Sequence, residues 1–189
     1  MVLVVLGVHN QVYRGACGDV AWVGYAAAMG LQQLTISLER RVYTALRSFA
    51  DRKSVKPAHL LTGEQGEDAA YFHLRGLGYT VVARRWRTAR LRGDLDLVAW
   101  DGPAIVLFEV KTRTARDLAP ADTAVDADKR RMLRRMGTAY LNQFPASVRG
   151  AIPLRFDILS VYLLATGTEF EHIRDAFPRT EPRDERGSW

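Results

Sequence analysis

The chain has 189 residues, of which 48% are hydrophobic and 25% charged, a length that suits one globular domain with extensions rather than two full domains. Its only cysteine, Cys17, excludes an intramolecular disulfide and favours a cytoplasmic protein, and no Cys/His spacing suggests zinc. The net charge of +6 favours an acidic partner such as nucleic acid, with a merely solvated basic surface as the alternative.

Residues 1–60 are predicted to form an N-terminal extension that is partly helical, with poor order as an open alternative. The stretch 20–38 has no charged residue and approaches the length of a membrane span, but its glycines and polar residues argue against stable membrane association. An amphipathic helix running to about residue 50 is predicted from helical spacing of Leu34, Leu38, Val42, Leu46 and Phe49.

The main domain is expected over 61–177, and it opens with a helix over 63–77. Thr62 and Gln65 have the spacing of a capping box, and Gly78 is placed to end this helix. A first strand over 79–83 leads into an arginine-rich segment around Trp86. Arginine forks suit phosphate oxygens, whereas core packing is favoured over base stacking for Trp86.

Two apolar strand-like runs over 93–113 are joined by turn residues, which predicts a β-hairpin. If the turn is centred on Gly102 and Pro103, Asp96 lies opposite Glu109 with Cβ atoms about 5 Å apart. Two carboxylates at this separation repel each other unless a cation such as Mg²⁺ lies between them. Lys111 follows on the same face of the strand as Glu109, within reach of a scissile phosphate or a metal-bound water.

After a loop over 114–122, a helix is expected over 126–144 with a basic first half that includes Lys129 and Arg130. A long strand is predicted over 154–164 and an edge strand over 169–173. The tail over 178–189 is rich in proline and charge, which is typical of disorder.

Four ordered blocks resemble the YraN family of endonuclease-like proteins, within the restriction-endonuclease-like, PD-(D/E)xK, superfamily. They are Gly-Glu-Gln-Gly-Glu-Asp-Ala-Ala at 63–70, Gly-Asp-Leu-Asp-Leu at 93–97, Phe-Glu-Val-Lys-Thr-Arg at 108–113 and Arg-Phe-Asp at 155–157. The chain departs from the usual family pattern at Asp94, where glutamate is usual, at Phe108, which directly precedes Glu109 without the usual valine between them, and near Arg85, where asparagine is usual. None of these departures removes an expected metal ligand.

The resemblance implies an α/β fold with a restriction-endonuclease-like core, in which a mixed β-sheet is flanked by helices in the order α-β-β-β-α-β. It implies that Asp96 and Glu109, with the Val110 carbonyl, bind Mg²⁺ or Mn²⁺. Lys111 would stabilise the transition state or act on the water, and Glu67 would approach the site from the first helix.

The expected function is therefore metal-dependent endonuclease activity on nucleic acid, with DNA favoured over RNA and a homodimer favoured if both strands of a duplex are cut. The alternative is a non-catalytic nucleic-acid-binding module that keeps the nuclease fold. The residues expected to contact nucleic acid are Arg84, Arg85, Arg87, Arg92, Arg113, Lys129 and Arg130.

Overall fold

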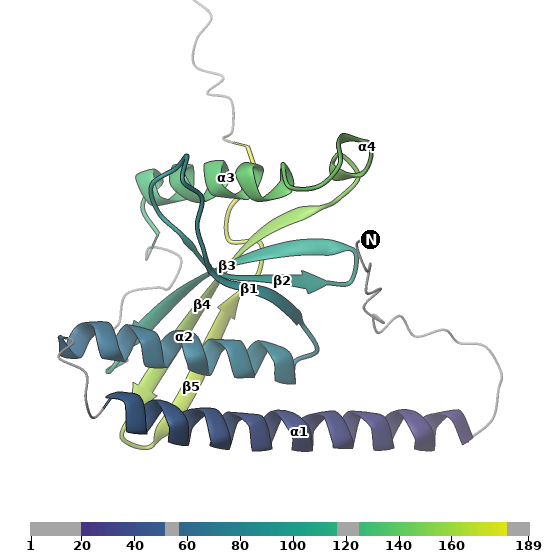
Figure 1. The fold of residues 1–189 in the computed structure, drawn as a ribbon, viewed down its shortest axis with the longest axis vertical. Coiled ribbons are helices and arrows are strands. Elements are labelled where there is room, and N and C mark those ends of the chain that lie inside the picture. The colour runs from purple at the N-terminus through teal and green to yellow at the C-terminus, as the bar shows by residue number, and fades with distance from the viewer. Residues whose placement is uncertain (1–19, 52–56, 117–124, 181–189) are drawn as a thin grey trace, which may run out of the picture.

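A computed structural model describes residues 20–51, 57–116 and 125–180 (Figure 1). Its helices are α1 (Val20–Asp51), α2 (Ala58–Gly76), α3 (Ala127–Leu141) and α4 (Ala146–Arg149). Its strands are β1 (Thr80–Trp86), β2 (Leu95–Asp101), β3 (Ala104–Arg113), β4 (Leu154–Leu164) and β5 (Gly167–Ile173). The expected order of helix, three strands, helix and strand is confirmed, with the short α4 added before β4 and β5 as the edge strand.

The five strands form one sheet in the order β1-β2-β3-β4-β5. Only β3 and β4 pair in parallel, and the other neighbours are antiparallel, so the sheet is mixed as predicted. Asp101 pairs with Ala104 and Leu97 with Phe108, which places the hairpin turn at Gly102 and Pro103. The hairpin register expected from the sequence is therefore confirmed.

Helices cover both faces of the sheet, with α2 on one face, α3 on the other, and α1 alongside α2 (Figure 1). Leu133 and Met136 of α3 belong to one buried cluster with Leu107, while Leu74 of α2 belongs to another with Phe108. Successive side chains of a strand point to opposite faces, so a strand that contributes to both clusters must be apolar at both parities. This explains the continuous apolar run in β3.

Helix α2 begins earlier than the sequence suggested, and the predicted capping box is wrong. Pro57 is the N-cap residue, and its carbonyl accepts hydrogen bonds from the backbone N–H groups of Leu60 and Leu61. The fixed φ of proline is suited to the start of a helix, so α2 begins at Ala58, upstream of the predicted start at residue 63. Thr62 therefore lies within the helix and does not cap it. Strand β1 is also longer than expected, because Arg84 and Trp86 pair with Leu97 and Leu95 of β2.

Helix α1 is confirmed, but the described part of its apolar stripe faces outward. Leu34, Leu38, Val42 and Leu46 are between 52% and 68% exposed. The side that packs on α2 instead carries Ile36, which is buried, and Tyr43, whose ring meets Phe72 edge-on. Within the described ranges, no helix is both long and apolar enough to cross a membrane. The predicted loop beyond residue 116 and the tail beyond residue 180 lie outside the description.

Candidate active site

The two central carboxylates are positioned by the β2–β3 hairpin. Leu97 and Phe108 are the last pair of the ladder, and Asp96 and Glu109 are the next residues on the two strands. Asp96 Oδ2 accepts a hydrogen bond of 2.7 Å from the backbone N–H of Val110. The hairpin geometry thus brings Asp96, Glu109 and Val110 together at the point where β3 runs on past the start of β2.

Glu109 is nearly buried and lies between two lysines. Its side chain is 4% exposed, with Lys111 Nζ 2.9 Å from Oε1 and Lys129 Nζ 2.9 Å from Oε2. Each carboxylate oxygen of Glu109 thus faces one ammonium group. These two positive charges offset part of the cost of burying the carboxylate.

Burial and the nearby negative charge of Glu109 raise the pKa of Asp96 from its usual 3.8 to about 7. Burial opposes the charged form of Lys129, but its attraction to Glu109 outweighs this and raises the pKa of its ammonium group. The carboxylate pair is therefore electrostatically strained at neutral pH, and positive charge relieves it. A carboxyl with a pKa perturbed in this way is typical of functional sites.

The oxygen atoms at this point suit Mg²⁺. In an extended strand the N–H and C=O of one residue point to the same side, so the Val110 carbonyl projects toward the side of Asp96. Within the described ranges, no three His, Cys, Asp or Glu side chains gather closely enough to hold a metal by themselves. Magnesium usually binds one or two carboxylates together with water and phosphate oxygens, which is what Asp96, Glu109 and Val110 leave room for.

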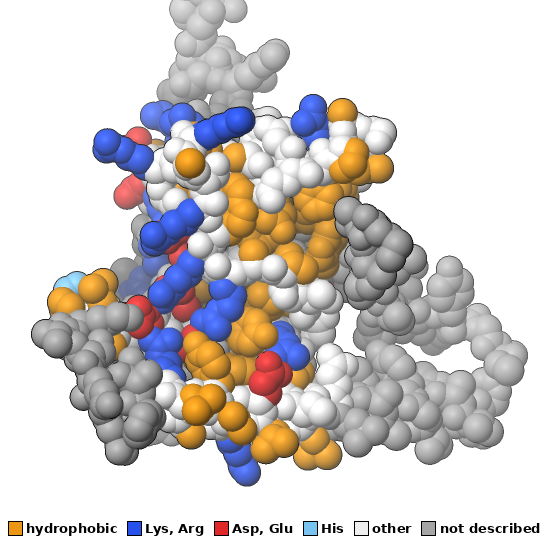
Figure 2. Space-filling view, in the orientation of Figure 1, with side chains coloured by type: hydrophobic (Ala, Val, Ile, Leu, Met, Phe, Trp, Pro, Cys, Tyr) orange, Lys and Arg blue, Asp and Glu red, His pale blue; other side chains and the backbone are white. Residues whose placement is uncertain are grey.

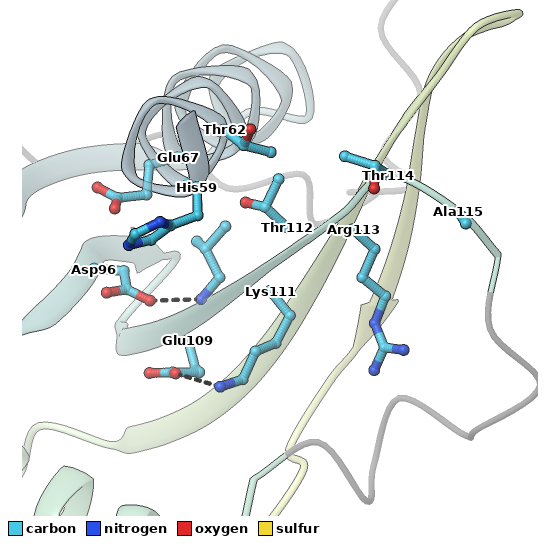
Figure 3. A pocket seen from close by; sticks show the side chains of 12 residues that line it. His59, Thr62, Glu67, Asp96, Glu109, Lys111, Thr112, Arg113, Thr114 and Ala115 are labelled. Atoms are coloured by element: carbon cyan, nitrogen blue, oxygen red, sulfur yellow. Dashed lines mark hydrogen bonds and ion pairs between the residues drawn. The ribbon is translucent and has the colours of Figure 1, made fainter. Parts of the chain in front are cut away.

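A cavity of about 640 Å³ opens at the carboxylate pair and separates β3 from the start of α2 (Figure 3). Asp96, Glu109 and Lys111 line it, and so do Glu67 and His59 of α2. Glu67 reaches the cavity as the sequence suggested. His59 was not predicted, because a single histidine in a polar stretch gives no signal before α2 is known to begin at Ala58.

Ion pairs within the protein involve four of the side chains that were expected to contact nucleic acid. Arg85 Nε lies 2.5 Å from Glu67 Oε2, and Arg84 pairs with Asp68 of the same helix. Arg87 pairs with Asp94 at 2.9 Å. Lys129, expected at nucleic acid, instead contacts Glu109 directly. The first two pairs join β1 to α2, the third lies within the β1–β2 connection, and the last joins α3 to β3. No sequence spacing indicated them.

The remaining predicted contact residues lie around the site. Arg113 lines the cavity, Arg92 is exposed on the β1–β2 connection, and Arg130 lies one residue after Lys129 on α3. Figure 2 shows lysine and arginine side chains in a band that runs from α3 toward the level of α2. Acidic side chains adjoin the lower part of this band (Figure 2).

A family model described as "Uncharacterised protein family UPF0102" matches residues 66–161. The chain belongs to this family. A UPF0102 protein of Koribacter versatilis is 46% identical over 122 residues, which are 65% of this chain and 82% of that protein. One from Solibacter usitatus is 44% identical over 61% of this chain and 84% of its own. One from Porphyromonas gingivalis is 38% identical over 67% of this chain and 90% of its own. The family is the YraN-like group, and its description assigns no activity.

The UPF0102 match contains Glu67, Asp96, Glu109 and Lys111, together with Lys129. It begins inside α2, so α1 and His59 lie outside it. The carboxylate pair and its two lysines are thus part of the segment that the family model describes, whereas the imidazole in the cavity lies upstream of it.

Replacing Asp96 with asparagine in this UPF0102 protein should change how stability depends on pH. Because the pKa of Asp96 is higher in the folded chain than in the unfolded chain, its contribution is complete below about pH 4 and is lost as pH rises through about 7. In EDTA, the Asp96→Asn variant should therefore gain on the order of 4 kcal/mol over wild type between pH 4 and pH 8, at about 1.4 kcal/mol for each unit of the pKa difference.

Urea unfolding at a series of pH values measures this difference. The control is Asp128→Asn, which removes an acid whose side chain is 93% exposed and should give a curve parallel to wild type. Parallel curves for Asp96→Asn as well would mean that Asp96 ionises as readily in the folded chain as in the unfolded one.

Proposed function

We propose that this protein is a Mg²⁺-dependent endonuclease that hydrolyses phosphodiester bonds, with DNA as the favoured substrate. The observation that carries the proposal is the carboxylate pair at the cavity, where Asp96 and the nearly buried Glu109 are neighbours on paired strands and Lys111 Nζ lies 2.9 Å from Glu109 Oε1. Two carboxylates, a lysine and the Val110 carbonyl form the group of oxygens and positive charge that metal-assisted phosphoryl transfer uses.

Each side chain has a distinct task in this proposal. Asp96 and Glu109 would hold the ion with the Val110 carbonyl. When bound there, Mg²⁺ would polarise the phosphate and acidify a water molecule. Lys111 is ion-paired with Glu109 and would place its positive charge against the phosphate oxygens as negative charge develops on them. Glu67 and His59 line the opposite side of the cavity, where each can accept a hydrogen bond from the attacking water.

The surroundings of the cavity favour a polyanionic substrate. Arg113 lies in its wall (Figure 3), and a band of lysine and arginine side chains runs from α3 toward the level of α2 (Figure 2). Phosphate oxygens are bound by arginine forks and lysine ammonium groups in preference to neutral donors. Nucleic acid supplies a row of such phosphates, and two copies of the chain could address the two strands of a duplex.

Calorimetric titration of Mg²⁺ and Mn²⁺ tests the metal site directly. Wild type should bind the metal, and the Asp96→Asn/Glu109→Gln variant should not, because it lacks both anionic ligands. The control Glu169→Gln/Glu171→Gln removes two acids from the edge strand β5 and should bind as wild type does. Labelled single-stranded, duplex and branched DNA added afterwards should be cut only by the proteins that bind metal.

Two results would contradict the endonuclease proposal. Wild type that binds no metal even with DNA present would lack the cofactor that the carboxylates are proposed to hold. Wild type that binds DNA with a strong salt dependence, but never cuts it in Mg²⁺ or Mn²⁺, would support the alternative of a non-catalytic binding module.

A further inference from the structure

A second cavity, of about 700 Å³, lies between the β1–β2 connection and α3. Its size falls within the range of about 300–1,000 Å³ that is usual for small-ligand sites. It shares no lining residue with the cavity at the carboxylates. It is therefore a separate feature of the surface that the proposed cleavage chemistry does not use.

The walls of this cavity are held in place by packing. The Trp86 ring meets Tyr140 of α3 edge-on at a centroid distance of 5.2 Å, and Leu91 packs against the buried cluster beneath α3. Gly93 has a φ of 105°, and a Cβ atom there would lie 2.7 Å from Met132 Sδ. The connection thus approaches α3 closely, so the cavity is formed before any ligand arrives, which lowers the entropic cost of binding.

The lining has the chemistry of a nucleotide site. It contains no acidic residue, and within the described ranges Arg90 and Arg135 form no ion pair. Their guanidinium groups are exposed and suit phosphate oxygens. The exposed amide of Gln143 offers both a donor and an acceptor to a base edge, and Trp86 with Leu91 gives an apolar surface for a base.

Both walls begin at the proposed cleavage site. Trp86 pairs with Leu95, the residue before Asp96, and α3 starts near Lys129, which contacts Glu109. Lys129 and Arg135 are about 9 Å apart along the helix at 1.5 Å per residue. At the 3.4 Å rise of a duplex strand this corresponds to about two or three nucleotides, and a more extended unpaired strand would span it with fewer. A strand that leaves the carboxylates along α3 therefore passes the second cavity.

We propose that this second cavity holds one unpaired nucleotide of the substrate, so that single-stranded or branched nucleic acid is preferred to blunt duplex. The proposal rests on the proposed function, because the same strand passes the carboxylates. A base that is stacked and paired in a duplex cannot enter the cavity without first leaving the stack, which costs free energy. An unpaired base enters without that cost.

Fluorescence anisotropy in EDTA tests this with a labelled single-stranded DNA, the RNA of the same sequence, and the blunt DNA duplex. Wild type should bind one of the single strands at least about tenfold more tightly than the duplex. The Arg90→Ala/Arg135→Ala variant should lose about tenfold in single-strand affinity, with a salt slope smaller by about 1.4 because two contacts of about 0.7 each are removed. Its affinity for duplex should change less than about twofold.

The matched control is Arg40→Ala/Arg41→Ala, which removes the same charge from α1 on the other side of the sheet (Figure 1). It should leave the single-strand preference unchanged, and Gln143→Ala should reduce that preference without changing the salt slope. Equal losses on single strand and duplex in Arg90→Ala/Arg135→Ala would overturn the proposal, because the arginines would then act only as general positive charge.

The two proposals fail in different ways. Wild type that cuts duplex DNA with Mg²⁺ but shows no single-strand preference would leave the endonuclease standing and overturn the unpaired-nucleotide site. Wild type that binds no nucleic acid in any form would overturn both.

Discussion

The Lys111→Ala variant should cut nucleic acid about 10² to 10³ times more slowly than wild type, with the Kd for substrate within about threefold. Lys111 Nζ lies 2.9 Å from Glu109 Oε1 and in the wall of the cavity, where it can reach a phosphate bound at the carboxylates. Negative charge on the phosphate increases in the transition state, so the loss of this ammonium group should affect kcat far more than binding. Single-turnover cleavage measures the rate of the chemical step, and fluorescence anisotropy measures the Kd for substrate.

Lys129→Ala is the matched control for Lys111→Ala, because Lys129 also lies 2.9 Å from Glu109 but does not line the cavity. Its loss should lower the cleavage rate by no more than about tenfold, through weaker placement of Glu109. Equal rate losses in the two variants would mean that Lys111, like Lys129, acts only by neutralising Glu109 and has no direct role at the phosphate.

The second large effect concerns the contact that holds α2 against β3. Gly66 is buried in α2, and a Cβ atom there would lie 2.7 Å from Thr112 Cβ and closer still to its hydroxyl. Neither backbone can move without shifting Glu67 or Lys111, so Gly66→Ala should destabilise the protein by about 2 kcal/mol or more. Urea unfolding measures this loss, and cleavage should weaken together with it.

Gly63→Ala in the same helix provides the comparison, since no atom lies within 4 Å of the added Cβ. It should stabilise the protein by about 0.5–1 kcal/mol through helix propensity alone. Adding Thr112→Gly to Gly66→Ala should reveal a favourable coupling of at least about 1 kcal/mol in a double-mutant cycle. Additive effects would mean that the close approach is not what constrains this position.

The parts of the fold that sequence predicted were those governed by neighbouring residues. Gly102 and Pro103 lie between two apolar runs, so the turn and the hairpin register follow from local chemistry. Strand β4 was predicted with its observed bounds because a long run of apolar and β-branched residues favours a buried strand over other kinds of secondary structure. The start of α2 was missed because a capping signature of four residues competes with the proline upstream of it.

The parts that sequence could not supply depend on segments far apart in the chain. Glu109 meets Lys129 only because the chain crosses over the sheet through α3 before pairing as β4. Arg84 and Arg85 were predicted to contact phosphate because the acids of α2 that pair with them are remote in the sequence. No local pattern specifies such pairs, so the clustering of arginines in the sequence does not show which of them pair with acids elsewhere in the protein.

The central position of β3 also determines when the carboxylate pair can acquire its final properties during synthesis. Glu109 lies beside Ile158 of the parallel strand β4, which follows the α3 crossover in the chain. A nascent chain that ends before β4 already carries Asp96, Glu109 and Lys111, but one edge of β3 is then open to water. Parallel pairing of remote segments is slow to form, so the carboxylates reach their buried state only after β4 has been synthesised and has paired with β3.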